Sequence, residues 1–271
     1  MICLVTDRRR LSAGADAVDR LVELVEAAVT AGIDLIQVRE RDLDARALAS
    51  LVQRCLAVTG ATRSQILVND RADAPQLLLP ICAARQVCQI EHRSSLCCRA
   101  QRDPEVVTGA AGLRLVTAAP EVDVVVSAAV GAAGVHLRGD SIGVSAARTL
   151  LGESAIVGQS VHSSREASLA SEAGADYLIF GTLFQTPSKD EGHPLASLDQ
   201  LREACHAAAG VPVLAIGGIT LERVPDLARC GAAGIAGVGV FLPPAGVSAE
   251  RHLHTVTAEL RRSFDTCEVV T

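Results

Sequence analysis

The chain has 271 residues, a formal net charge of −6 and a hydrophobic content of 49%, but only 2% of its residues are aromatic. An acidic balance disfavours a nucleic-acid-binding surface, which is usually basic, and no apolar run approaches the ~20 residues that span a bilayer. Because the first residues also lack the layout of a signal peptide, we expect a cytoplasmic protein that binds neither nucleic acid nor membranes.

Short apolar runs alternate with amphipathic segments from the start of the chain. The runs that predict strands are 2–5, 35–38, 65–68, 134–137, 155–158, 177–180, 211–216 and 233–236. The segments in which apolar residues recur with a helical period are 16–30, 45–58, 144–151, 164–173, 195–209, 221–230 and 248–263. This alternation predicts parallel strands joined by right-handed crossovers. Eight such strands in a chain of this length predict a TIM (β/α)8 barrel. A doubly wound sheet is the alternative, although no Gly-x-Gly-x-x-Gly motif follows the first strand.

One interval breaks this alternation. The stretch between the third and fourth strands is far longer than one barrel helix needs, and its middle mixes Cys, Arg, Gln and Ser without clear periodicity. We therefore predict a single-domain barrel, residues 1–271, with an insertion at about 75–127 after the third strand.

Polar side chains follow most of the predicted strands, and parallel α/β proteins place their chemistry at the carboxyl ends of the strands. In chain order the clusters are Gln37-Val-Arg39-Glu-Arg41, Asn69-Asp70-Arg71, Val135-His136-Leu137, Ser160-Val-His162-Ser163, Gly181-Thr-Leu-Phe-Gln-Thr186-Pro-Ser188-Lys189 and Ala215-Ile-Gly217-Gly218-Ile219. Each motif alone is weak, but the ordered series resembles the thiamine phosphate synthase family, which includes the thiazole tautomerases. The resemblance covers nearly all of the chain outside about 75–127.

The resemblance implies a TIM barrel with small phosphorylated pyrimidine and thiazole substrates. A synthase of this family joins hydroxymethylpyrimidine pyrophosphate to a thiazole phosphate alcohol and releases pyrophosphate with the help of magnesium. A tautomerase instead aromatises a carboxythiazole phosphate by moving a proton. A barrel that binds thiazole phosphate without turnover is a third possibility, and the sequence leaves a homo-oligomer open.

Cations and amides predict the pyrophosphate and pyrimidine contacts. A departing pyrophosphate must be held by cations, which Arg39, Arg41 and Lys189 supply as planar forks and a compact charge. Each of these cations alone could belong to a solvated, charged surface, but its position shortly after an apolar strand favours a role in a ligand-binding site. Gln37 and Asn69 carry amides able to read the edge of a pyrimidine ring.

Magnesium is expected at Asp70, whose carboxylate is a hard oxygen ligand, although Asn69-Asp70 could also form a turn or helix cap. The synthase pattern has a second acidic ligand after His-Leu, in a form like HLGQED. Here the sequence VHLRGDS places Ser141 at that position and Asp140 one residue earlier. Either Asp140 is the second metal ligand through a shifted loop, or the metal site is weakened, which would favour the tautomerase.

The phosphate cradle is predicted after the last two strands, at Gly217, Gly218, Val238 and Gly239, where backbone N–H groups of TIM barrels commonly bind phosphate. The family usually has a Ser where Gly239 stands, so one hydroxyl donor is missing. By the same resemblance, the hydroxyl groups before Lys189 are assigned to substrate binding: Thr186 and Ser188.

Two side chains of the fourth cluster are candidate catalytic groups beside Lys189: Ser160 and His162. An imidazole at a strand end could move a proton, and the form Ser-Val-His-Ser resembles the tautomerases, although some synthases share it. His162 could instead only neighbour a helix cap formed by Ser163. We expect His136 to pack below the site as a structural residue.

Overall fold

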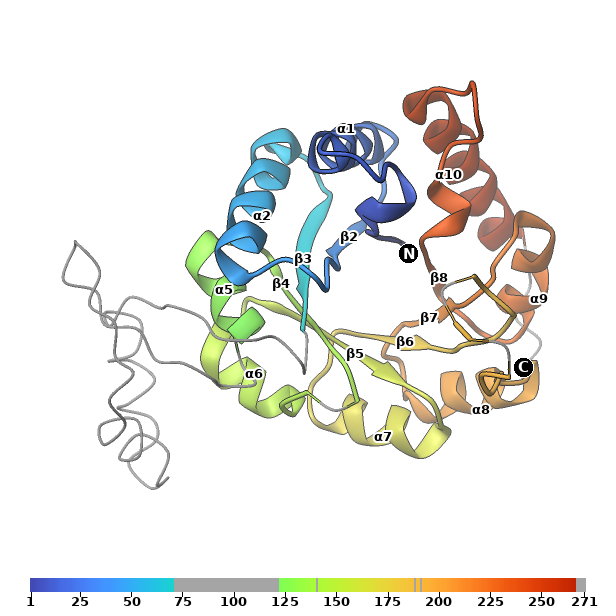
Figure 1. Cartoon of the computed structure of the whole chain (residues 1–271). Helices are drawn as coiled ribbons and strands as arrows, with labels where there is room; N and C mark the ends of the chain where they lie inside the picture. Colours follow the sequence, from blue (N-terminus) through green and yellow to red (C-terminus); the bar gives the residue numbers. More distant parts are fainter. Residues whose placement is uncertain (71–121, 140, 188, 191, 267–271) are drawn as a thin grey trace, which may run out of the picture.

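The computed structural model describes residues 1–70, 122–139, 141–187, 189–190 and 192–266. Eight parallel strands form a closed barrel in chain order, because β1 pairs with β8 as well as with β2 (Figure 1). The strands are β1 (Ile2–Val5), β2 (Leu35–Val38), β3 (Gln65–Asn69), β4 (Gly134–Leu137), β5 (Ile156–Val161), β6 (Tyr177–Phe180), β7 (Val213–Ile216) and β8 (Gly234–Gly237). The predicted TIM barrel is thereby confirmed.

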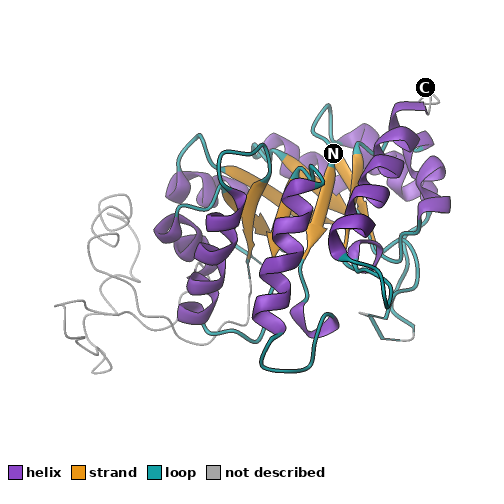
Figure 2. Cartoon of the chain, turned by 90° about the horizontal axis from the view of Figure 1, so that it is seen from above, coloured by secondary structure: helices purple, strands orange, loops and turns teal. Residues whose placement is uncertain are grey.

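Helices cover the outside of the barrel, as the purple ribbons around the orange strands show in Figure 2. They are α1 (Ala17–Thr30), α2 (Ala45–Thr59), α5 (Val122–Val130), α6 (Val144–Leu151), α7 (Ser164–Glu172), α8 (Leu198–Ala207), α9 (Val224–Arg229) and α10 (Ala249–Thr266). Short 3-10 helices follow the ends of β1, β7 and β8, at Arg8–Arg10, Leu221–Arg223 and Gly239–Phe241. α1 packs against α2 and α10, and α7 packs against α8.

The interval predicted as an insertion, about 75–127, extends too far at its end. Residues 122–127 belong to α5, which packs against α2, α6, β3 and β4 and so occupies the helix position between β3 and β4. Asp123 and Ser127 are fully buried on this helix, and the hydroxyl of Ser127 donates a hydrogen bond to the carbonyl of Gly134. Because its polar residues are buried, the segment lacks the polar face that marks an amphipathic helix in sequence. The rest of the predicted insertion lies outside the described residues.

Two layers of apolar side chains build the core. Alternate residues of the strands point to opposite faces, so Ile2 and Leu4 pack among the outer helices while Cys3 and Val5 belong to a separate inner group. The inner group consists of Cys3, Val5, Leu35, Leu67, Tyr177, Ile179, Leu214 and Ala236. It fills the barrel and gives the site above it a rigid floor.

Local sequence signals explain where two helices begin. Ser197 caps α8 in a capping box: its hydroxyl accepts a hydrogen bond from the N–H of Gln200, whose side-chain oxygen accepts one from the N–H of Ser197. The hydroxyl of Ser163 likewise accepts from the N–H of Glu166 and starts α7, as the sequence suggested. Among the described residues, no helix is both long and apolar enough to cross a bilayer.

Candidate active site

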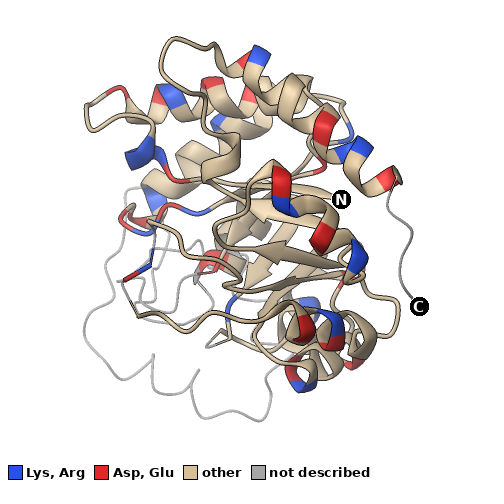
Figure 3. Ribbon diagram, turned by 90° about the vertical axis from the view of Figure 1, so that its right-hand side faces the viewer, with Lys and Arg blue, Asp and Glu red and all other residues tan. Residues whose placement is uncertain are grey.

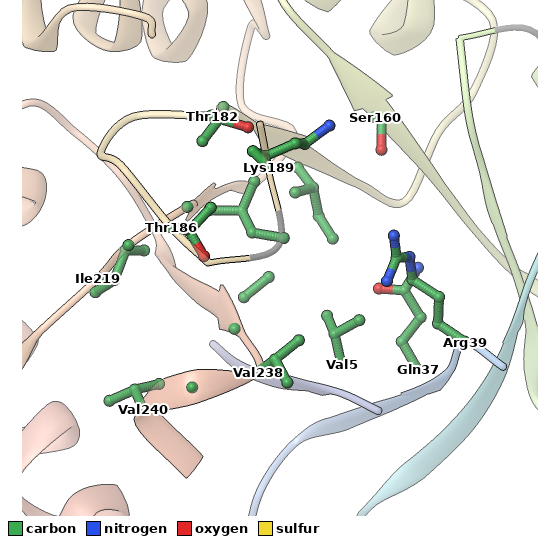
Figure 4. A pocket seen from close by; sticks show the side chains of 18 of the residues that line it. Val5, Gln37, Arg39, Ser160, Thr182, Thr186, Lys189, Ile219, Val238 and Val240 are labelled. Carbon is green, nitrogen blue, oxygen red and sulfur yellow. The ribbon is translucent and has the colours of Figure 1, made fainter. Parts of the chain in front are cut away.

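A cavity of about 700 Å³ lies at the carboxyl ends of the strands (Figure 4). Every strand contributes at least one lining residue near its end, namely Val5, Gln37, Asn69, His136, Ser160, Ile179, Ile216 and Ala236. Loops that follow the strands complete the lining. The cavity therefore lies where TIM barrels hold their active sites.

The lining carries an excess of positive charge. Its cations are Arg10, Arg39, Arg41, Arg138, Lys189 and Arg223. No carboxylate from the described part of the chain lines the cavity, whereas acidic and basic residues are interspersed along the outer helices (Figure 3). Because clefts lined by one sign of charge concentrate ions of the opposite sign, this cavity is suited to strongly anionic ligands.

Four of the cations lie close together, and we call Arg39, Arg41, Arg138 and Lys189 the cationic end of the cavity. The pKa of Lys189 is lowered first by loss of surrounding water and then by the charges of Arg41, Arg39 and Arg138. The pKa of Arg39 is lowered by burial first and by Arg41 next. These four groups repel one another, so an anion with several charges would relieve their repulsion on binding.

A buried network holds the backbone of Arg39 in place. The hydroxyl of Thr6 accepts a hydrogen bond from the N–H of Arg39 at 3.0 Å and donates one to the carboxylate of Glu40 at 2.7 Å. Glu40 also accepts from the guanidinium of Arg8 at 2.9 Å, and Arg8 pairs in turn with Asp42. Satisfied buried networks of this kind fix local geometry, so the loops after β1 and β2 are joined behind the cationic end.

An amide pair stands next to the cationic end. Nε2 of Gln37 donates a hydrogen bond to Oδ1 of Asn69 at 2.6 Å, and Nδ2 of Asn69 donates to the carbonyl of Asp70 at 2.7 Å. Both amide side chains are buried yet line the cavity, with exposures of 2% for Gln37 and 4% for Asn69. Amides fixed in this way present defined hydrogen-bonding groups to the edge of a planar ring.

Backbone groups dominate the opposite end of the cavity, where β7 finishes at two glycines. Gly217 and Gly218 have φ angles of +105° and +58°, which glycine adopts readily. A Cβ atom on Gly218 would stand 2.3 Å from the carbonyl oxygen of Gln185. The carbonyl of Gly217 accepts from the N–H of Phe184, whereas the N–H of Gly218 donates to no acceptor among the described residues. An available N–H group at this position suits a phosphate.

Two guanidinium groups flank these glycines. Nη1 of Arg223 donates to the carbonyl of Gly218 at 2.8 Å, and the same guanidinium lies 4.1 Å from the ring centroid of Phe184. Arg10 lies beside Gly239, where an added Cβ would be 3.5 Å from its Nη1. We call Gly217, Gly218, Gly239, Arg10 and Arg223 the glycine end. Figure 4 shows Ile219 and Val240 on this side of the cavity, opposite Gln37 and Arg39.

Ser160 and His162 both line the cavity, at and just beyond the end of β5. Nδ1 of His162 lies 2.6 Å from the carbonyl oxygen of Gly181 and must donate to it, which leaves Nε2 as an acceptor when the ring is neutral. Oγ of Ser160 lies 2.9 Å from Nε2 of His136. His136 is buried, as expected for a structural residue, but it also lines the cavity and contacts a candidate catalytic group directly.

Comparisons with known proteins show the family of this chain. The sequence pattern of the family described as thiamine monophosphate synthase matches residues 2–78 and 102–241. The chain belongs to the thiamine monophosphate synthase family. The family match omits 79–101, a stretch inside the interval predicted as an insertion.

Curated relatives of the family match along most of their length. The chain is 30% identical to the thiamine-phosphate synthase of Roseiflexus sp. over 259 residues, which cover 95% of this chain and 85% of the relative. It is 31% identical to that of Haloquadratum walsbyi over 267 residues, covering 98% and 92%. The solved structure of the thiamine phosphate pyrophosphorylase from Pyrococcus furiosus superposes with a TM-score of 0.63 at 23% identity, covering 97% of this chain and 95% of that one, and so supports the barrel fold.

Most of the residues predicted from the family resemblance line one cavity. They are Gln37, Arg39, Arg41, Asn69, Ser160, His162, Thr186, Lys189, Gly217, Gly218, Val238 and Gly239. The carbonyl of Thr186 accepts a hydrogen bond from the N–H of Lys189, so the loop after β6 turns Lys189 back over the barrel. Two predicted residues, Ser188 and Asp140, lie outside the described residues.

The predicted magnesium ligands are not brought together in the described part of the structure. Asp70 directly follows β3, with its N–H bonded to the carbonyl of His136 at 2.8 Å, but its side chain is fully buried and is not part of the cavity lining. Ser141 supports a turn by accepting from the N–H of Arg138 at 2.8 Å. Among the described residues, no three acidic, His or Cys side chains are grouped as metal ligands. The donor chemistry of Asp70 suits magnesium, but a single carboxylate does not complete a site.

Sequence reasoning missed three of the cavity's cations: Arg10, Arg138 and Arg223. Arg138 could have been found, because it directly follows β4 in the same way that Arg39 follows β2. Arg10 is the last of three consecutive arginines, and Arg223 lies in the 3-10 helix before α9. Neither position distinguishes a ligand contact from an ordinary surface charge.

Proposed function

We propose that this protein is a thiamine phosphate synthase that couples hydroxymethylpyrimidine pyrophosphate to thiazole phosphate and releases pyrophosphate. The observation that carries the proposal is the shared cavity of the amide pair Gln37–Asn69 and the four cations of the cationic end. A simple thiazole phosphate binder needs one phosphate site, and a tautomerase needs a phosphate site and contacts for one carboxylate, so neither accounts for four further cations. Membership of the family supports the same activity.

In this proposal the pyrimidine ring lies against the amide pair, and its pyrophosphate lies among Arg39, Arg41, Arg138 and Lys189. The bond between the methylene carbon and the pyrophosphate oxygen breaks, and its electron pair goes to the departing oxygen. The cations stabilise the charge that develops there, the kind of interaction that contributes most to many enzymatic rates. The ring nitrogen of the thiazole then donates its lone pair to the methylene carbon.

The thiazole is proposed to occupy the middle of the cavity, with its phosphate at the glycine end. Apolar side chains line the space between the two ends, including Val5, Ile179 and Ile216. The N–H group of Gly218 and the guanidinium of Arg10 are the proposed phosphate contacts. Holding both substrates in one cavity raises their effective concentration and aligns the nitrogen with the carbon that it attacks.

Magnesium is part of the proposal, with Asp70 and Asp140 as the residues that would hold it. A bound magnesium ion would neutralise part of the pyrophosphate charge. The cationic end carries the remaining stabilisation in this proposal. The measurement is product formation as a function of magnesium, after chelation with EDTA, in the wild type and in Asp70→Asn.

The test of the synthase is an assay with purified protein, the pyrimidine pyrophosphate, thiazole phosphate and magnesium. We expect thiamine phosphate and one equivalent of pyrophosphate as products. We expect Gln37→Ala to raise the KM for the pyrimidine substrate. Saturable binding of thiazole phosphate without product would overturn the synthase and support the non-catalytic binder.

One observation favours the tautomerase as a second candidate. The contact between His162 and the carbonyl of Gly181 fixes the tautomer and leaves Nε2 as a proton acceptor at the cavity. Carboxythiazole phosphate incubated in deuterated water separates the candidates. Deuterium incorporation that disappears in His162→Ala, without thiamine phosphate formation by the wild type, would support the tautomerase.

The cytoplasmic location and a homo-oligomeric state stay predictions.

A further inference from the structure

A chain of three hydrogen-bonding side chains runs from the barrel core to the cavity. The hydroxyl of Tyr177 lies 3.0 Å from Nδ1 of His136, and Nε2 of His136 lies 2.9 Å from Oγ of Ser160. Tyr177 is 1% exposed and does not line the cavity, whereas His136, 2% exposed, and Ser160 both do. Glycine at position 158 makes room for the phenol ring, because a Cβ there would stand 2.1 Å from Cζ of Tyr177.

The surroundings of the phenol determine the direction of these hydrogen bonds. In the described part of the chain, the hydroxyl of Tyr177 has one hydrogen-bond partner, the imidazole of His136. If Nδ1 carried a proton, the phenol would have to accept it and its own buried proton would lack an acceptor, which is costly. The phenol therefore donates to an unprotonated Nδ1. A neutral imidazole then carries its proton on Nε2.

The neutral state of His136 has an independent physical basis. Its side chain is buried, and burial lowers its pKa to about 3, with a smaller contribution from the charge of Arg39. The hydrogen bond to Ser160 would nevertheless keep its direction in an imidazolium, since both ring nitrogens would then be donors. Only the Nδ1–H tautomer would reverse it.

We propose that Tyr177 and His136 act as positioning residues that make Ser160 a hydrogen-bond donor toward the cavity. Nε2–H of His136 donates to Oγ of Ser160, so the proton of Ser160 is directed away from the imidazole and toward bound substrate. A hydroxyl donor is suited to an anionic oxygen. The identity of that oxygen rests on the proposed synthase, in which it is the pyrophosphate oxygen that gains charge as the carbon–oxygen bond breaks. The direction of the hydrogen bonds does not depend on that function.

The tautomer can be measured without any assay of activity. The chain has seven histidines, so the ring signals of His136 are assigned by comparing two-bond ¹H–¹⁵N spectra of the wild type and His136→Gln. We expect the neutral Nε2–H tautomer at neutral pH. A neutral Nδ1–H tautomer would overturn the proposal.

Kinetics test whether Tyr177 acts through Ser160. Ser160→Ala should lower kcat by about 10²-fold, as loss of one donor to a developing anion does. Tyr177→Phe removes only the hydroxyl and should lower kcat by roughly threefold to tenfold, the effect of one hydrogen bond, with little change in KM. In the double variant, Tyr177→Phe should add no further loss. Losses that multiply would show an effect on structure independent of Ser160 and would overturn the proposal.

Two variants at position 136 distinguish loss of the hydrogen bond to Ser160 from a general loss of structure. His136→Gln keeps a side chain able to donate to Ser160, whereas His136→Leu does not. We expect the Gln variant to retain more of kcat than the Leu variant when both have the same thermal midpoint, and equal losses of kcat would count against the assignment. A wild type that forms no thiamine phosphate but shows the Nε2–H tautomer would refute the function and leave the hydrogen-bond direction standing.

Discussion

The two ends of the cavity present different groups. The cationic end has four charged side chains from the loops after β2, β4 and β6, whereas the glycine end has backbone groups after β7 and β8 with two flanking guanidinium groups. The charges of the cationic end lie near one another: the pKa values of Arg39 and Lys189 are lowered first by loss of surrounding water and then by the neighbouring cations. The backbone groups of the glycine end carry no full charges and do not repel one another in this way. The first arrangement is suited to an anion that would form during the proposed reaction, and the second is suited to a phosphate that does not change.

This difference predicts different kinetic signatures for the two ends. Interactions that strengthen in the transition state affect kcat, whereas interactions that are equal in substrate and transition state affect KM alone. Substitutions at the cationic end should therefore lower kcat, and those at the glycine end should raise the KM for thiazole phosphate.

The largest effect is expected for Arg39→Met, which keeps the length of the side chain and removes its charge. Arg39 is largely enclosed and its backbone is held by Thr6, so water cannot replace the lost charge well. We expect kcat to fall by about 10²–10³-fold, comparable to the loss of one preorganised anion contact, in steady-state assays of pyrophosphate release. Arg46→Met on the exposed surface of α2 is the matched control and should retain wild-type kcat. A change confined to KM would contradict the distinction between the ends.

A smaller effect, and a different one, is expected for Gly218→Ala. The added Cβ would meet the carbonyl of Gln185 at 2.3 Å in a backbone conformation that alanine adopts poorly, so the cradle must shift. The KM for thiazole phosphate should rise by roughly 10–100-fold, corresponding to one or two charge-assisted hydrogen bonds, with kcat within about threefold.

Gly246→Ala provides the control for backbone strain in this comparison. Gly246 also has a positive φ, +81°, but nothing lies within 4 Å of an added Cβ and the residue does not line the cavity. It should lose stability in thermal unfolding without any change in KM. Equal KM values for the two variants would show that the glycine end does not bind the phosphate.

How far sequence could predict this site depends on how each group reaches the cavity. Arg39 and Lys189 were predictable because an apolar strand precedes each cluster and fixes which end of the barrel it occupies. The three consecutive arginines after β1 were not: Arg8 pairs with Glu40 and Asp42, Arg9 pairs with Asp42, and Arg10 lines the cavity. The three arginines differ in role only because the 3-10 helix directs their side chains differently. A run of identical residues has no periodic pattern from which those directions could be predicted.

The fold shows the same division between local and tertiary information. Alternating strands and helices predicted the barrel, but α5 was assigned to an insertion because Asp123 and Ser127 are buried by tertiary packing. His136 was predicted to be structural from its place within β4. Its link to Ser160 depends on the register that pairs His136 with Gly158 across β4 and β5, and pairing registers cannot be read from one strand alone.

Arg10→Met should have a modest effect that sharpens the description of the glycine end. The guanidinium of Arg10 lies beside Gly239 at the edge of the cavity and is exposed, so solvent screens part of its attraction for a phosphate. We expect the KM for thiazole phosphate to rise by roughly threefold to tenfold at low salt, and by less at high salt. Arg9→Met, one residue earlier, removes an equal charge outside the cavity and should leave KM unchanged. Equal effects of both variants would indicate long-range attraction instead of contact.

The smallest effect at neutral pH is expected for Lys189→Arg, which should differ from the wild type only in alkaline solution. The pKa of Lys189 is lowered by loss of water and by Arg41, Arg39 and Arg138, so the free protein loses this charge at a lower pH than an isolated lysine does. Affinity for inorganic pyrophosphate should therefore decline as pH rises through that lowered pKa. Bound pyrophosphate restores the pKa, so binding takes up a proton in this range. Arginine stays charged throughout, and titration calorimetry should show that Lys189→Arg keeps its affinity to higher pH. If the affinity of both proteins for pyrophosphate declined equally at alkaline pH, a titrating group outside the cationic end would be responsible for the decline.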